Sequence, residues 1–137
     1  MRARWPRRLM PCLVAAAAAM ASGCGTGADR DQARAAAERF YAAVRQHDGR
    51  TACEQLSPSL RAQLVKDQPG DDCATAVLHL SLHGSRAAAV RVYATAGEVV
   101  LAGGDTVFLG DTRQGWRLDA VGCKPQGSGP FDCEEQA

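Results

Sequence analysis

Two aspartates are the best candidates in this chain for general acid–base chemistry. Asp105 follows Gly103-Gly104, a pair typical of a hairpin turn, and Asp119 lies in an apolar run near Trp116. Either carboxylate has the chemistry of a proton donor or acceptor. Asp in a turn usually bonds nearby backbone groups, and Asp119 two residues from Arg117 suits a solvated strand face. We therefore expect structural roles for both and predict no catalytic residue.

Two histidines have a spacing seen in metal sites. His79 and His83 are four residues apart, which on a helix places both imidazoles on one face. No carboxylate follows at a fitting distance, and Gly84 ends the segment, so we expect no metal site. His47 is expected in the last turn of a helix, where a cation is favourable. The chain has no nucleophile-elbow serine and no phosphate-binding loop, and no cofactor is expected.

Four cysteines fit an exported protein. Cys53, Cys73, Cys123 and Cys133 allow three pairings as two disulfides. We favour Cys53–Cys73 and Cys123–Cys133, because each pair is near in sequence and brackets a loop rich in Gly, Pro and Asp. A zinc site is disfavoured, since the cysteines form no C-x-x-C pair and no His lies near the last two.

The first 24 residues look like a lipoprotein leader. Four arginines precede an apolar run from Leu9 to Met20, which is too short to span a membrane but typical of a secretory signal. Ala21-Ser22-Gly23-Cys24 resembles the lipobox of bacterial lipoproteins. That resemblance implies cleavage between Gly23 and Cys24, with a diacylglycerol and further acyl chains such as palmitate anchoring Cys24 to the membrane. The alternative is ordinary secretion with a free Cys24.

Cleavage before Cys24 sets the charge and the layout of the mature protein. Removing the four leader arginines from 16 basic residues leaves 12 against 15 acidic ones. That balance argues against a nucleic-acid partner. We expect a signal peptide at 1–23, a lipidated tether at 24–28, one domain at 29–123 and a disulfide-tied tail at 124–137. The expected location is the outer face of the cell membrane; the oligomeric state stays open.

The first half of the domain is expected to be helical. Apolar residues recur every three or four positions from 29 to 47, and Gly49 is expected to end this helix. The segment Thr51 to Glu54 fits a capping box that opens a short helix ending near Leu56.

Two further helices are expected before the sheet. Ser57-Pro58 predicts a cap and a helix over 59–66, with Leu60 and Leu64 facing inward. Asp71 or Asp72 is expected to cap a fourth helix. The run 78–83 alternates apolar and polar residues, so helix and strand both stay open there.

The second half changes to a period of two. Strands are expected at 88–95, 98–102, 105–110 and 116–122, with turns at 96–97, 103–104 and 111–115, as an antiparallel meander. Successive strand residues point to opposite faces of the sheet, so each strand has two possible orientations, or phases. One phase buries the apolar set Val90, Val92, Val99, Leu101, Val107, Leu109, Trp116 and Leu118. The opposite face then carries Arg91, Glu98, Arg117 and Asp119. This phase leaves no ionisable group on the inward face, which argues against proton-transfer catalysis.

Helices followed by a bent antiparallel sheet resemble the NTF2-like (cystatin-like cone) α+β fold. More narrowly, the chain is similar to uncharacterised lipoproteins of high-GC Gram-positive bacteria (actinobacteria). The segments that carry this are 36–41, 53–58, 104–109, 115–118, 122–123 and 131–133. The resemblance implies a fold that hosts isomerases, dehydratases and non-catalytic binding modules alike.

Aromatic residues are the candidates to line a ligand pocket on such a fold. They are Trp116, Phe40, Tyr41 and Tyr93, with core or outward packing as the alternative for each. We expect a lipid-anchored, non-enzymatic binding or accessory domain for an envelope protein or a small apolar ligand. The alternative is a small pocket enzyme of the isomerase or hydrolase type, which would show an Asp, His or Tyr projecting into the concave face.

Overall fold

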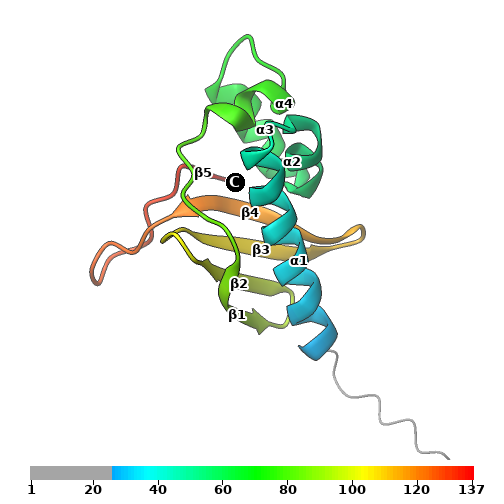
Figure 1. Ribbon diagram of the computed structural model, residues 1–137, viewed down its shortest axis with the longest axis vertical. Helices are drawn as coiled ribbons and strands as arrows, with labels where there is room; N and C mark the ends of the chain where they lie inside the picture. Colours follow the sequence, from blue (N-terminus) through cyan, green and yellow to red (C-terminus); the bar gives the residue numbers. More distant parts are fainter. Residues whose placement is uncertain (1–25) are drawn as a thin grey trace, which may run out of the picture.

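The computed structural model describes residues 26–137, which form an α+β domain with the helices first (Figure 1). The expected leader, the cleavage point between Gly23 and Cys24 and the lipidated cysteine lie outside these residues. Residues 26–28, expected in a tether, already belong to the first helix. The elements are α1 (Thr26–Arg45), α2 (Gly49–Gln55), α3 (Pro58–Asp67), α4 (Cys73–Ala76), the 3-10 helix η1 (Val77–His79), β1 (Ala87–Tyr93), β2 (Ala96–Leu101), β3 (Thr106–Thr112), β4 (Gly115–Cys123) and β5 (Glu135–Gln136).

The sheet is an antiparallel meander in the order β1-β2-β3-β4-β5. The four predicted strands are confirmed. The fifth was missed, because a two-residue strand has no periodicity to detect. It pairs with β4 through Ala120 with Gln136 and Val121 with Glu135. The tail is therefore held by strand pairing as well as by its disulfide. Glu135 is buried, and burial together with the charge of Asp67 on α3 raises its pKa.

The predicted strand phase is confirmed. The six inward residues of β2, β3 and β4 are at most 3% exposed, whereas Val90 and Val92 on β1 are half-buried against the core. On the other face, Arg91 Nη1 lies 2.8 Å from Glu98 Oε1, and the two residues face each other in register. The fully buried set is Val99, Leu101, Val107, Leu109, Trp116 and Leu118.

Helix α1 lies across one face of the sheet, with α2, α3 and α4 gathered beyond its C-terminal end (Figure 1). Its buried stripe consists of small residues, Ala33, Ala36 and Ala37, followed by Phe40 and Tyr41. Small side chains let the helix axis approach the sheet closely, and the two aromatic rings fill the space farther along. Those rings meet edge to face with centroids 5.2 Å apart.

The end of α1 differs from the prediction. His47, with φ 57°, takes the left-handed position that ends the helix, and it lies two residues past Arg45. Gly49 instead opens α2, where an added Cβ would overlap the carbonyl oxygen of Ala74. The cap of α2 is Asp48, whose Oδ1 accepts from Thr51 N at 3.1 Å, rather than a box starting at Thr51. Hydrogen bonding from the Thr51 side chain, and next from its backbone N–H, lowers the pKa of Asp48.

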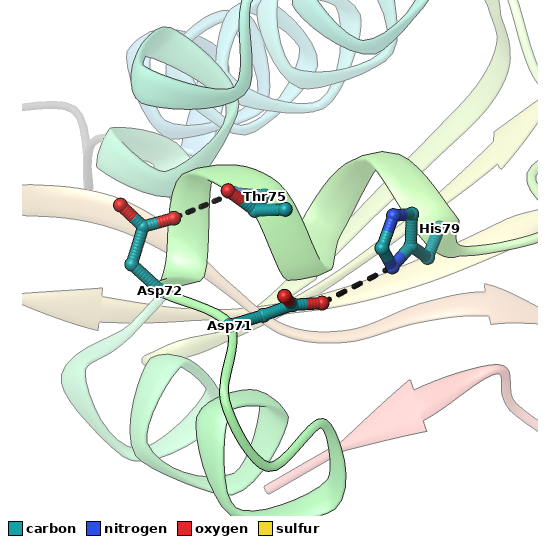
Figure 2. A network of polar contacts seen from close by, with 4 residues as sticks. All are labelled: Asp71, Asp72, Thr75 and His79. Carbon is teal, nitrogen blue, oxygen red and sulfur yellow. Dashed lines mark hydrogen bonds and ion pairs between the residues drawn. The ribbon is translucent and has the colours of Figure 1, made fainter.

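The next two caps match the prediction. Ser57 Oγ accepts from Leu60 N at 3.2 Å at the start of α3, and Leu60 and Leu64 are fully buried. Asp72 caps α4, where its Oδ1 accepts from Thr75 N at 2.8 Å. Figure 2 shows the contact between these two residues, and hydrogen bonding from the Thr75 side chain, and next from its backbone N–H, lowers the pKa of Asp72. Over 78–83, the segment left open, the 3-10 helix ends at residue 79 and the chain continues without strand pairing.

The first hairpin turn lies two residues earlier than expected. Ala94 and Thr95 make it, with Ala94 at φ 50°, and Gly97 lies inside β2. Gly97 is needed there for room, since an added Cβ would lie 3.0 Å from the Trp116 ring. The turn at Gly103-Gly104 is as predicted, with φ values of 113° and 104°.

Both predicted disulfides are present. Cys53–Cys73 joins α2 to α4, and Cys123–Cys133 joins the end of β4 to the tail. Across residues 26–137, none of the helices combines the length and apolar character that a membrane crossing requires.

Candidate functional site

A cleft of about 220 Å³ opens between α1, the last residue of α2 and the beginning of β4. It is smaller than the ~300–1,000 Å³ typical of pockets for drug-sized ligands. Its lining mixes guanidinium and amide groups with one aromatic ring: Gln32, Ala35, Ala36, Arg39, Gln55, Gln114, Gly115, Trp116 and Arg117.

The cleft forms where the sheet edge is left uncovered by a strand. Within the described part of the chain, β5 pairs with β4 only at residues 120–121, so residues 115–117 have no strand on the side away from β3. Just beyond, Leu56 bridges to Leu118, and Ser57 N donates to the Leu118 carbonyl at 2.8 Å. This bond seats the end of α2 against β4. Helix α1 then closes the remaining side.

Of the four aromatic residues predicted to line a pocket, Trp116 lines this cleft. It is 3% exposed and contributes both to the core and to the cleft lining. Phe40 and Tyr41 do not line the cleft, because they are fully packed between α1 and the sheet. Tyr93 is 63% exposed at the end of β1. These three residues therefore do not line this cleft.

The polar groups of the cleft are basic or neutral. Arg39 Nη1 donates to Gln55 Oε1 at 3.4 Å, and Gln55 Nε2 donates to the Thr51 carbonyl at 3.4 Å. Arg117 Nη1 donates to the carbonyl of Trp116 at 3.0 Å, and its buried Nε has no partner. Among the described residues that line the cleft there is no carboxylate, imidazole, thiol or phenol. The side chains that line the cleft offer hydrogen-bond donors and acceptors, but none of them is a usual proton donor or acceptor for catalysis.

Asp105, the residue before β3, is a buried ionisable group where the strand phase predicted none on the inward face of the sheet. It is fully buried, and its Oδ2 accepts from Tyr41 Oη at 2.9 Å and from His83 N at 2.7 Å. Tyr41 Oη in turn accepts from Gly122 N at 3.3 Å. Burial, and next the charge of Asp105, raise the pKa of Tyr41.

This buried network, defined by Tyr41, His83 N, Asp105 and Gly122 N, joins four parts of the chain. It connects α1, the segment before β1, the residue before β3, and β4. Tyr41 and Asp105 are at most 1% exposed, and neither lines the cleft. Asp105 is thus not a simple turn residue that bonds neighbouring backbone, because its partners are 22 and 64 residues away. We assign the network a structural role.

The histidine pair does not share a helix face. His79 ends η1, where its Nδ1 lies 3.3 Å from Asp71 Oδ2 (Figure 2), and His83 is exposed in the extended segment that follows. Within residues 26–137, no group of three or more His, Cys, Asp or Glu side chains is arranged to hold a metal ion. Asp119 lies half-buried on the outer face of β4.

Sequence reasoning missed most of the cleft. Arg39 and Gln32 follow from the helix period as residues off the buried stripe, but nothing local indicates that they face Gln114 and Arg117, about 80 residues away in the chain. No known protein family, characterised protein or solved structure significantly matches this chain. A proposal for the function of this protein therefore rests on the geometry of the cleft.

Proposed function

We propose that this protein is a lipid-anchored, non-enzymatic binding domain of the NTF2-like type, held on the outer face of the cytoplasmic membrane. The order of helices followed by an antiparallel meander supports the fold assignment, and the small-residue step into Cys24 supports the anchor. The two disulfides suit an oxidising compartment.

The observation that carries the binding role is the polar cleft over Trp116. It presents hydrogen-bonding guanidinium and amide groups beside an aromatic ring, within about 220 Å³. Enzymes of this fold class place an acid or base where the substrate binds. Here the buried Tyr41 and Asp105 side chains engage each other and lie outside the cleft. A pocket enzyme would need them in contact with substrate.

Replacing Cys24 with serine should release the protein from the membrane. The hydroxyl cannot form the thioether to a diacylglycerol, so the acyl chains that hold the protein on the membrane are lost. Fractionation of cells fed labelled palmitate should show label and membrane association in the wild type only. Cys12→Ser, a matched change inside the expected leader, should leave both unchanged. Membrane association of Cys24→Ser equal to wild type would contradict the anchor.

Filling the cleft should abolish ligand binding. Ala35 lines the cleft from α1 and is exposed, so Ala35→Trp fills the space without disturbing the core. Native mass spectrometry of protein purified from its own membranes should show a bound small molecule in the wild type. Occupancy should fall at least about tenfold in Ala35→Trp. Ala28→Trp, also exposed on α1 but outside the lining, is the control. A chain with no bound mass, or equal occupancy in Ala35→Trp, would overturn the binding role.

A further inference from the structure

We infer that the cleft binds a small organic acid, whose carboxylate lies between Arg39 and Arg117; this rests on the binding role proposed above. Both arginines line the cleft, Arg39 as an exposed residue of α1 and Arg117 as a half-buried residue at the uncovered edge of β4. Within residues 26–137, neither has a carboxylate within ion-pair distance, although 15 acidic residues are present in the sequence. The two guanidinium groups are therefore paired only with neutral groups.

The present partners of these guanidinium groups are weak or incomplete. Arg39 meets the Gln55 amide at 3.4 Å, a long hydrogen bond. Arg117 bonds the carbonyl of its own neighbour, and its Nε is buried without a partner. A carboxylate would satisfy both groups with charge-assisted bonds, which are about twice as strong as neutral ones. The planar guanidinium fork matches the two oxygens of a carboxylate.

The surrounding elements favour a carboxylate over a phosphate. Phosphate sites commonly use the N-terminus of a helix, where backbone N–H groups point at the anion. Here the cleft meets α1 along its side and meets α2 at Gln55, its last residue. The C-terminal end of a helix carries partial negative charge, which disfavours a second negative charge on the ligand.

The remaining lining sets the size and character of the acid. Gln32 and Gln114 offer amide donors and acceptors, and Trp116 offers a flat apolar surface. About 220 Å³ suits a molecule smaller than a drug-sized ligand. The ligand class is thus a short organic acid with a polar body, rather than a purely apolar molecule.

Trp116 provides the readout for a test on the mature protein. The sequence has two tryptophans, Trp5 and Trp116, and cleavage before Cys24 removes Trp5, so Trp116 is the sole tryptophan emitter. N-acetylglycine is the probe, N-acetylglycinamide its neutral match, and inorganic phosphate the competing anion. We expect saturable change in emission with N-acetylglycine, at least about tenfold weaker binding of the amide, and weaker binding of phosphate.

Variants locate the binding groups. Arg39→Gln and Arg117→Gln should each weaken N-acetylglycine binding at least about tenfold, and Arg39→Lys should recover it only in part, because lysine keeps the charge but not the fork. Arg34→Gln, exposed on α1 outside the lining, is the matched control. Thermal melts of each variant establish that it is folded.

The outcomes separate this inference from the binding role. Equal binding of acid and amide, tighter binding of phosphate, or unchanged binding by both arginine variants would overturn the carboxylate assignment. In any of these cases, the binding role still stands if native mass spectrometry finds a bound molecule on the wild type that is absent from Ala35→Trp. Absence of both the co-purified mass and any response to N-acetylglycine would overturn both.

Discussion

Replacing Asp105 with alanine is expected to lower the free energy of unfolding by about 3 kcal/mol. The change removes the acceptor of two buried donors, Tyr41 Oη and His83 N, which lie 2.9 Å and 2.7 Å from Oδ2. Each buried donor left without a partner costs about 1–3 kcal/mol. Urea unfolding followed by circular dichroism measures the loss. Asp111→Ala, exposed on β3, should change stability by less than about 0.5 kcal/mol.

Two further variants distinguish the hydrogen bonds from simple loss of volume. Asp105→Asn keeps an oxygen that can accept from both donors, but it places an amide where Oδ1 has no partner. Its cost should therefore lie between those of wild type and alanine. Tyr41→Phe removes one of the same bonds, so the double variant Tyr41→Phe with Asp105→Ala should lose less than the two single losses added. Full additivity, or an Asp105→Ala effect as small as that of Asp111→Ala, would contradict the buried network.

Removing the Cys53–Cys73 disulfide is the second large effect. The bond closes a loop with a sequence separation of 20, worth about 3 kcal/mol in the chain-entropy account. Cys53→Ala with Cys73→Ala should therefore unfold at clearly lower urea than wild type. It should also loosen α4, a four-residue helix that this bond cross-links to α2.

The second disulfide is the matched comparison. Cys123–Cys133 closes a loop with a separation of 10, so its removal should cost somewhat less. Loss of this bond should leave the cleft intact, because neither cysteine lines it. Non-reducing peptide mapping checks both pairings. Two results would rule out Cys53–Cys73 as a stabilising bond. One is a peptide map in which Cys53 is linked to Cys123 or Cys133, and the other is a Cys53→Ala, Cys73→Ala variant as stable as wild type.

Local periodicity was enough to predict the element types and which strand face is buried. Alternation of apolar and polar residues placed Val99, Val107 and Leu118 inward, because consecutive strand side chains must point to opposite faces. The Ser57-Pro58 step predicted the start of α3, since a cap needs only a side-chain oxygen three residues before a free N–H. Neighbouring cysteines paired as expected because short loops bring them together.

The local pattern gave the wrong role for two glycines. The local pattern predicts a turn at Gly97 and a helix end at Gly49, but the two glycines make room for the Trp116 ring and for the carbonyl of Ala74. A glycine serves either for backbone freedom or for space, and the residue type does not say which. The left-handed positions near them are taken by Ala94 and His47 instead.

The helix-then-sheet order and the cysteine pairing follow from residues close together in the chain, so the sequence by itself determined them, whereas the leader stays a prediction from the sequence. Only the tertiary structure decided which distant side chains meet. Tyr41 finds Asp105 across 64 residues, and Arg39 shares a cleft with Arg117 because β5 leaves the first residues of β4 uncovered. Such contacts depend on how α1 packs across the sheet, and no local pattern in the chain encodes that position.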